Sequence, residues 1–518
     1  MRISAPSWER DWPLAVLAAA ALLLAAPLWC VSAPAMPDYP AHLASFWLIG
    51  RGTDPAYFIH WGFIPNLASE ILVPGLARLT GLTMAARLFL TAAVLMWVLG
   101  PGAIHRALYG RWGEAPIAGA FFAYNANFSW GFFNYYFAMG LGFLVFAAWI
   151  ERERKTRGWL GLFAAAITIV YFCHIFAAAT LLLMIAVYEI ALAHRRTGWN
   201  IRGLLPRAAA VAAIYAPAAI AFLFLRPHNT GDLRVQFDLA DTALDRFESL
   251  IEHSFDDPAY ALPVLLFAGL AAALLRHRAR LHPLMWGVLG VLLIGSLFAP
   301  EWAMGGWAVH LRLPAVFATM LFAATELRLD IRLARALAGG LLALIAWNGG
   351  ALAADWGVYD RQVAEFRTAD RAIPRGARIV TVLDGDAIGL ASDQPYWHMA
   401  EFAIIDRAAF TPLMFTTAGQ HVVQLRESYK SVAAATAQQG SPPDIDELAF
   451  LAAGQTGADE DIMNVFPYLL RFQCHFDQAV VIHLGGQRSP VPPMLRLVHA
   501  GSFFSLYDIV PDAACARR

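Results

Sequence analysis

Charged residues are scarce in this chain. Only 15% of its 518 residues are Asp, Glu, Lys or Arg, while 59% are hydrophobic. A soluble globular protein carries about 25% charged and about 45–50% apolar residues. The shortage of charge therefore excludes an ordinary soluble fold for most of the chain, and it indicates that lipid is the solvent.

Cysteine is scarce as well. The chain has four cysteines, too few for a disulfide scaffold, and none has the spacing of metal ligands. Cys30 and Cys173 lie in apolar runs, where we expect buried thiols. Cys474 and Cys515 lie near the C-terminus and can pair if that segment is in the oxidising periplasm. The sequence leaves this pairing open.

The common catalytic signatures are missing too. We find no phosphate loop, no Ser-His-Asp signature, no zinc motif and no dinucleotide fingerprint. The net charge of −1 provides no basic footprint, so nucleic acid is not an expected partner. Candidate functional residues therefore have to come from the topology.

Long apolar runs dominate the rest of the chain. Lipid offers no hydrogen bonds to the backbone, so such runs fold as helices, and about 20 residues span a bilayer. The first run is longer than the core of about 7–15 residues in a signal peptide, and we expect it to remain as a span. Eleven predicted spans lie at 12–34, 84–104, 115–130, 132–150, 159–172, 173–193, 207–225, 260–276, 283–299, 311–326 and 332–352.

Basic loops predict the orientation of these spans. Short cytoplasmic loops of bacterial inner-membrane proteins are rich in Lys and Arg. With the N-terminus in the cytoplasm, alternating spans place five basic loops there, namely 105–114, 151–158, 194–207, 276–282 and 326–335. The first loop 35–83, the tips near 125–134 and 172–174, the acidic loop 226–259 and the loop 300–310 then face the periplasm.

One segment of the first loop is ambiguous. Residues 62–82 are moderately apolar but contain Pro65, Pro74 and Gly75. We expect an interfacial helix there. If this segment spans the membrane instead, the number of spans becomes twelve or thirteen.

The C-terminal part has a different composition. From Asp355 onward, 13 Lys and Arg stand against 19 Asp and Glu, whereas the preceding part has 25 against 20. Turn-forming residues separate short β-rich runs from helical stretches. The sequence thus predicts a polytopic helical bundle over 1–355 and a soluble periplasmic α/β domain over 360–518. The expected strands are 378–383, 479–484, 495–499 and 503–509, and the expected helices are 397–409 and 420–437.

Asp38 and His42 follow the first span directly. They lie four residues apart, and Pro40 between them suits the first turn of a helix. Side chains at this spacing share a helix face, so they can form one base or bind one cation. The alternative is that Asp38 only caps the helix.

Aromatic and amide side chains gather at the next predicted periplasmic tip, in the run Tyr124–Tyr136. Such a surface suits a polyhydroxylated ligand, although aromatic belts are also routine at membrane interfaces. His174 lies at the following tip, where helix packing is the alternative role. The candidate sugar- or acceptor-lining residues are Asn125, Asn127, Trp130, Asn134, His174 and Glu301.

Arg312 lies at the predicted outer edge of a span, where basic residues are disfavoured. Since a charge is expensive there, a bound anion such as a phosphate is a reasonable partner for Arg312 and the neighbouring His310. An ion pair with Glu301 or with another acid is the alternative.

An acidic residue just after the first span, followed by an amphipathic interfacial segment, resembles the GT-C superfamily of integral-membrane glycosyltransferases. These enzymes use polyprenyl-phosphate-linked sugars, and many carry a periplasmic C-terminal domain. The resemblance covers the architecture of the whole chain, and its motif-level match is Asp38 with its neighbours. It implies a sugar transfer in the inner membrane, with membrane lipid and a polyprenyl-phosphate sugar as partners.

The resemblance also implies roles. Asp38, with His42, would deprotonate the acceptor or hold a divalent cation, for which Asp38 is the candidate ligand. Arg312, with His310, would neutralise the lipid phosphate that leaves. Two other functions stay open: a transporter or flippase of lipid-linked saccharide, and a non-catalytic envelope scaffold.

Overall fold

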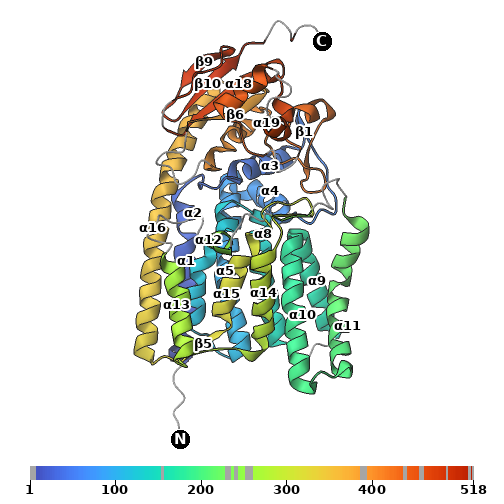
Figure 1. Ribbon diagram of the computed structural model, residues 1–518, viewed down its shortest axis with the longest axis vertical. Coiled ribbons are helices and arrows are strands. Elements are labelled where there is room, and N and C mark those ends of the chain that lie inside the picture. Colours follow the sequence, from blue (N-terminus) through green and yellow to red (C-terminus); the bar gives the residue numbers. More distant parts are fainter. Residues whose placement is uncertain are drawn as a thin grey trace. The chain divides into compact units, whose positions relative to one another are not determined.

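Figure 1 shows the computed structural model of the chain. The structure describes residues 7–152, 157–227, 235–237, 243–250, 261–385, 394–435, 440–453, 460–485, 488–511 and 515. The predicted acidic loop 226–259 falls largely outside these residues. The chain forms two compact units. The helical unit comprises residues 1–30, 63–71 and 87–354, and the mixed unit comprises residues 31–62, 72–86 and 355–518.

Six helical segments among the described residues are long and apolar enough to cross a membrane. They are α1 with α2 (Ser7–Ala25 and Pro27–Cys30), α5 (Leu82–Tyr109), α8 (Phe133–Glu151), α10 (Ile175–Thr197), α11 (Ile201–Ile220) and α16 (Ile331–Ala369). Four shorter apolar helices are α9 (Arg157–Cys173), α13 (Ala261–Leu275), α14 (Trp286–Phe298) and α15 (Arg312–Ala323). The protein is therefore a polytopic helical membrane protein.

The predicted span 115–130 is wrong as a single helix. This stretch contains α6 (Ala115–Gly119), the 3-10 turn η1 (Ala120–Ala123) and α7 (Ala126–Ser129). Asn125 has extended backbone angles, and its side chain accepts a hydrogen bond from the Asn127 backbone N–H. This amide starts a new helix and ends the preceding turn, an effect that apolar composition does not reveal.

Two helices begin or end elsewhere than the sequence predicts. The interfacial segment forms α4 (Ala68–Thr80), whose 13 residues are about 20 Å long and too short to span. The last span continues as α16 to Ala369, well past the predicted end at 352. No proline interrupts α16, and Pro374 lies just beyond it.

Glycines let α5 and α8 approach closely in the helical unit. A Cβ on Gly100 would lie 2.7 Å from the Phe143 Cβ, and one on Gly140 would lie 3.0 Å from the Met96 Cβ. Small residues have this role at helix contacts in lipid, where the hydrophobic effect does not drive association.

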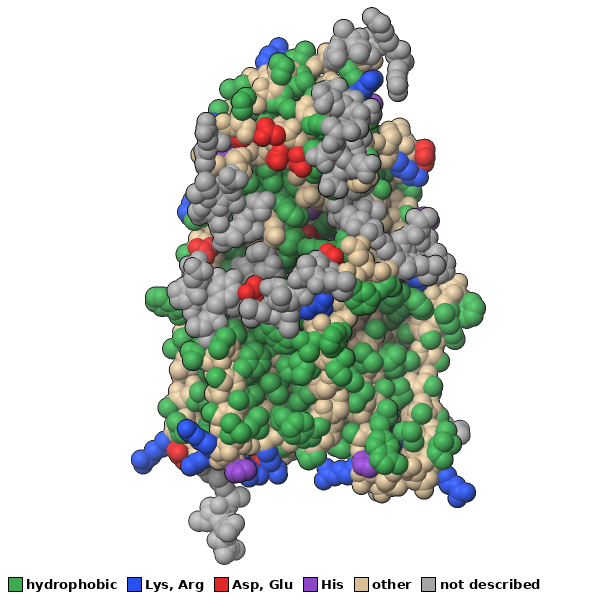
Figure 2. Space-filling view, viewed as in Figure 1, with side chains coloured by type: hydrophobic (Ala, Val, Ile, Leu, Met, Phe, Trp, Pro, Cys, Tyr) green, Lys and Arg blue, Asp and Glu red, His purple; other side chains and the backbone are tan. Residues whose placement is uncertain are grey.

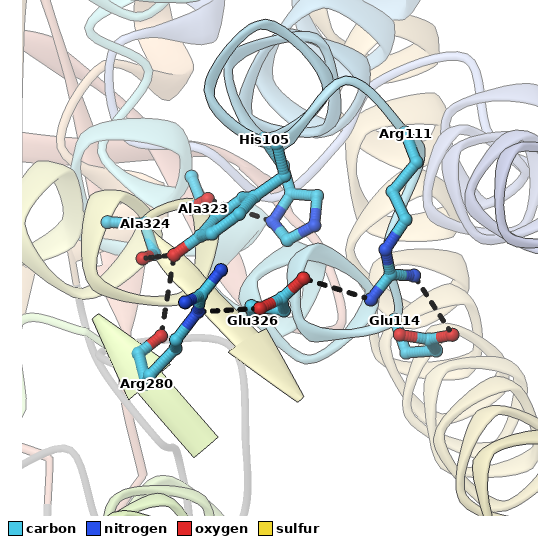
Figure 3. Close-up of polar contacts among 8 residues, drawn as sticks. His105, Arg111, Glu114, Arg280, Ala323, Ala324 and Glu326 are labelled. Carbon is cyan, nitrogen blue, oxygen red and sulfur yellow. Dashed lines mark hydrogen bonds and ion pairs between the residues drawn. The ribbon is translucent and has the colours of Figure 1, made fainter. Parts of the chain in front are cut away.

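Basic side chains gather at one end of the helical unit, near β5 (Thr325–Leu327), while hydrophobic side chains cover its flank (Figures 1 and 2). Glu326 accepts a hydrogen bond from Arg280 Nε at 2.7 Å and lies 3.5 Å from Arg111 Nη2 (Figure 3). Arg111 also pairs with Glu114 at 3.8 Å. Three of the predicted basic loops therefore meet at this end, while their cytoplasmic orientation stays a prediction.

The mixed unit contains a four-stranded sheet with the order β6-β8-β10-β9. Strand β6 is parallel to β8, and β10 is antiparallel to both β8 and β9. The four predicted C-terminal strands match these elements. Their bounds are β6 (Ile379–Asp384), β8 (Gln478–His483), β9 (Leu495–Ala500) and β10 (Phe504–Ile509).

The predicted helix 420–437 is wrong. The structure has β7 (Val423–Leu425) and a 3-10 turn η8 (Glu427–Val432) there. Strand β7 pairs antiparallel with β1 (Tyr57–Ile59) of the first loop. The partner strand is more than 350 residues away in the chain, so a local pattern could not show it. The first loop and the C-terminal segment thus belong to one unit.

Short helices and a disulfide complete the mixed unit. The predicted helix 397–409 is shorter and consists of a 3-10 turn η7 (Met399–Glu401) followed by α17 (Phe402–Arg407). Ala408, in left-handed conformation with φ 53°, ends α17. Helices α18 (Ile445–Ala453) and α19 (Glu460–Val465) follow, and Cys474 is bonded to Cys515.

Candidate active site

Asp38 precedes α3 (Tyr39–Arg51) in the mixed unit. Pro40 lies in the first turn of this helix, as predicted. Asp38 occupies the N-cap position, but its φ of −79° and ψ of −10° are helical and its side chain makes no capping hydrogen bond. The capping interpretation of Asp38 is therefore wrong. The partly buried carboxylate is available for other interactions.

His42 lies one turn further along α3 and is buried. Its ring stacks on Phe46 with 5.9 Å between centroids, and it meets the Phe415 ring edge-on at 5.3 Å. Its backbone N–H donates to the Asp38 carbonyl oxygen at 2.9 Å. The packing fixes the His42 imidazole at the same end of α3 as Asp38.

A buried hydrogen-bonded group from the C-terminal segment lies near Asp38. His398 Nδ1 is 3.2 Å from Glu401 Oε1, and the Thr411 hydroxyl donates to the same oxygen at 3.2 Å. Glu401 is fully buried, and its Oε2 has no hydrogen-bond partner among the described residues. The His398 ring also contacts Phe415 at 5.0 Å.

Electrostatics links this group to Asp38. Burial raises the pKa of Asp38 to about 7, and the nearby His398 acts in the opposite direction. Burial lowers the pKa of His398, but Glu401 and Asp38 together raise it above its ordinary value. The Asp38 carboxyl is therefore poised to exchange a proton near neutral pH, as a general base must be.

His398 and Glu401 lie in the expected helix 397–409, and the sequence analysis gave them no chemical role. The signal that could have revealed them is their separation of three residues in a polar, aromatic segment, which puts both side chains on one face of a helical turn. Their proximity to Asp38 depends on the packing of α3 against η7 and α17.

A divalent cation was an open question at the Asp38 position. Among the described residues, no group of three or more His, Cys, Asp or Glu side chains has the arrangement of a metal site. The described neighbours of Asp38 are the His398 imidazole and, on α3, the His42 ring.

Arg312 begins α15 in the helical unit and is 7% exposed. Its Nη2 donates to the Trp307 carbonyl oxygen at 3.0 Å, whereas Nε and Nη1 have no hydrogen-bond partner among the described residues. Three aromatic rings surround the guanidinium carbon, at 5.4 Å from Phe132, 5.4 Å from Tyr135 and 4.8 Å from Phe176.

Glu301 does not neutralise Arg312. Its Oε1 accepts a hydrogen bond from Trp307 Nε1 at 2.9 Å, and no described carboxylate forms an ion pair with Arg312. The Glu301 ion-pair alternative is therefore wrong. Trp307 also meets Trp130 edge-on at 4.9 Å, which places Trp130 in the aromatic wall on this side of the unit.

The three candidate asparagines are buried and make internal hydrogen bonds. Asn125 caps α7, and Asn127 Nδ2 donates to the Leu311 carbonyl oxygen at 3.2 Å, next to Arg312 in the chain. Asn134 accepts from the Ser69 backbone N–H at 2.7 Å and donates to Glu70 at 2.8 Å. Their contact with a sugar stays a prediction.

Glu70 in α4 is a buried carboxyl that the sequence analysis missed. Burial raises its pKa to about 7, although hydrogen bonds from Asn134 and Ser69 act in the other direction. Its hydrogen-bond partner Asn134 is far away in the sequence. A single acid in an amphipathic helix is usually a surface residue, so the sequence pattern did not indicate a buried carboxyl.

His174 and His310 are the remaining candidates. His174 precedes α10, and its Nδ1 accepts a hydrogen bond from the Phe176 backbone N–H at 3.2 Å. Its ring also meets the Tyr135 ring at 5.3 Å, so it packs against an aromatic neighbour of Arg312. His310 is buried two residues before Arg312. His174 therefore belongs to the surroundings of the guanidinium, and His310 is close to Arg312 in the chain.

Comparison with known proteins supports the architecture. No protein-family description and no curated protein sequence matches this chain. The crystal structure of ArnT from Cupriavidus metallidurans bound to undecaprenyl phosphate matches it with a TM-score of 0.51 and 13% identity. The match covers 98% of this chain and 99% of that ArnT chain. The chain therefore has the fold of this ArnT structure, and the predicted architecture, a polytopic helical bundle with a C-terminal domain, is confirmed.

Proposed function

We propose that the protein is a membrane glycosyltransferase of the bacterial inner membrane. It moves a sugar from a polyprenyl-phosphate donor to a periplasmic or lipid acceptor. The observation that carries the proposal is Asp38, a partly buried carboxyl that does not cap its helix and whose pKa lies near 7. The similar ArnT structure, which holds undecaprenyl phosphate, supports a lipid of this class as the carrier.

Asp38 is the base of the proposed reaction. It accepts the proton of an acceptor hydroxyl while the oxygen forms a bond to the anomeric carbon of the sugar. The bond between that carbon and the phosphate oxygen breaks, and its electron pair leaves with the polyprenyl phosphate. Direct displacement of this kind inverts the anomeric centre. General-base catalysis is worth about 10²–10⁴-fold in rate.

Arg312 is the proposed ligand of the lipid phosphate. A guanidinium presents a planar set of donors that matches phosphate oxygens, and Nε and Nη1 of Arg312 lack partners among the described residues. Burying a charge without a counter-ion is costly, so an anion that pairs with it stabilises the site. Three aromatic faces hold the guanidinium until that anion arrives.

Asp38→Asn is the decisive variant. Asparagine has nearly the same size but cannot accept a proton, so we expect transfer to fall at least about 100-fold. Purified protein in lipid nanodiscs is incubated with undecaprenyl-phosphate sugars carrying a tritium label, and the label that leaves the polyprenyl lipid is measured. Thermal unfolding and membrane insertion should stay unchanged. A fully active, normally folded Asp38→Asn protein would falsify the proposal.

The same protein and labelled lipid, reconstituted in vesicles, distinguish the transporter alternative from the transferase. Movement of intact labelled lipid between leaflets, without transfer, would support a flippase. The buried acid of α10, Glu189, gives that alternative no support, since it accepts a hydrogen bond from Trp149 Nε1 at 2.9 Å and is paired with Arg207.

A further inference from the structure

Two buried ionisable side chains of the mixed unit have no role in the proposed chemistry. His398 is 3% exposed and Glu401 is fully buried. Both lie at η7, which, together with α17, packs against α3, the helix that follows Asp38. Buried charges are costly unless they are paired, and Glu401 has two polar partners for only one of its oxygens.

The pairing holds the imidazole in one orientation. The Glu401 carboxylate binds Nδ1 of His398, and the Phe415 ring lies edge-on at 5.0 Å from the imidazole. A carboxylate at Nδ1 favours the imidazolium form. The imidazolium in turn favours the charged form of Asp38, so His398 is coupled electrostatically to both carboxyl groups.

We propose that His398 and Glu401 are positioning residues for Asp38: Glu401 holds His398 as a fixed cation, and this cation keeps Asp38 as a carboxylate that is ready to take a proton. The inference rests on the proposed function, because it assigns Asp38 its task. It connects the C-terminal segment to the reaction through electrostatics, since this segment provides both residues.

Several other described ionisable groups near these residues are neutral at pH 7, paired with an opposite charge or hydrogen-bonded to the backbone. Burial lowers the pKa of His421, whose ring stacks on Phe415 with 5.4 Å between centroids, to about 4, so this imidazole is neutral at pH 7. On α17, Asp406 is paired with Arg367, and Arg407 Nε donates to the Ile373 carbonyl oxygen. Further neighbours among the described residues are His42, which contacts Phe415, and the tyrosines Tyr57, Tyr359 and Tyr468 around Glu401.

Glu401→Gln tests the charge and largely keeps the geometry. Glutamine retains an oxygen for His398 Nδ1 and for the Thr411 hydroxyl but carries no charge. The titration of His398 is followed by NMR of full-length protein labelled with carbon-13 at histidine Cε1, and His398→Asn assigns the signal. We expect the pKa of His398 to fall by about one unit in Glu401→Gln and also in Asp38→Asn, because the coupling between two titrating groups is reciprocal.

Transfer kinetics provide the second readout. Asp38 must be ionised to act as a base, so the rate rises with pH through its pKa. Without the cation that pKa rises, and the acid limb of kcat/KM should move up by about one pH unit in Glu401→Gln and His398→Asn. At a pH below the limb the rate then falls about tenfold, while at pH 9 it stays within about twofold of the parent enzyme.

His421→Asn is the matched control, because it removes a half-buried histidine that also stacks on Phe415 and is neutral at pH 7. We expect neither readout to move in this variant. If Glu401→Gln does not fold, His398→Asn still tests the acid limb. If the acid limb of kcat/KM is the same in the folded variants as in the parent enzyme, the inference is overturned. An unchanged pKa of His398 in Glu401→Gln and Asp38→Asn also overturns it. These results leave the proposed function intact, which fails only if Asp38→Asn is active.

Discussion

A buried arginine without a carboxylate partner is unusual, because the charge loses its hydration and gains no counter-ion. Arg312 has this situation within the part of the chain that the structure describes. Aromatic faces compensate for part of the loss but leave Nε and Nη1 without hydrogen bonds. These two nitrogens without partners support the proposal that Arg312 binds a ligand with oxygen acceptors.

Arg312→Lys should weaken this binding and leave the protein inserted. Lysine keeps the positive charge but loses the planar fork of the guanidinium. We expect the affinity for undecaprenyl phosphate, measured by native mass spectrometry, to fall about tenfold. Arg246→Lys is the control, since Arg246 is also buried in the helical unit but donates to a backbone oxygen of Ala299. Equal affinities of Arg312→Lys and parent protein would contradict the phosphate role and favour a structural one.

At the scale of the element, the sheet of the mixed unit contains a buried series of hydrogen bonds between polar side chains. Asp384 Oδ2 is 2.9 Å from His483 Nδ1, and His483 Nε2 is 2.9 Å from the Ser505 hydroxyl. The three residues come from β6, β8 and β10. Ser505 is only 3% exposed and lies within a paired strand. These hydrogen bonds therefore stabilise the sheet, and the Ser505 hydroxyl is not presented as a nucleophile.

Asp384→Asn should loosen these strands. The amide cannot replace both acceptor oxygens, of which one binds His483 and the other the Ser489 backbone N–H. Leaving a buried group unsatisfied costs about 1–3 kcal/mol. Hydrogen exchange of the β8 and β10 amides should therefore accelerate at least about fivefold. Arg496→Ala provides the comparison, because it removes an exposed ion pair with Asp508 that is worth about 0–1 kcal/mol. Equal amide hydrogen exchange in the two variants would exclude a stabilising role for the hydrogen bonds of Asp384 and His483.

At the scale of the whole molecule, the orientation in the membrane stays a prediction. Five basic loops agree on a cytoplasmic side, and three of them meet at one end of the helical unit. Alkaline phosphatase fused after Arg518 should therefore be active. The same reporter fused at Lys155, which lies outside the described residues, should be silent. Activity of the Lys155 fusion would reverse the predicted arrangement.

Most spans and strands could be predicted, because burial in lipid or in a sheet imposes a local pattern. Long apolar runs predicted the helices, and short β-rich runs between turn-forming residues predicted β6, β8, β9 and β10. The failures have a common cause. Asn125 interrupts the apolar stretch 115–130 with one capping amide, and β7 is a strand only because β1 pairs with it. A local pattern does not contain the contact that decides such cases.

The residues of the candidate site likewise fall into those that the sequence could indicate and those that only the structure reveals. The sequence by itself determined that the chain is a polytopic membrane protein, and it singled out Asp38 and Arg312, because acids and arginines at membrane edges are costly and few. Only the tertiary structure decided that Asp38 does not cap its helix, that Glu301 does not pair with Arg312, and that His398 and Glu401 lie near Asp38. The physical reason is that hydrogen bonds and charge pairs act over a few ångströms of space, and 360 residues of chain separate Asp38 from His398.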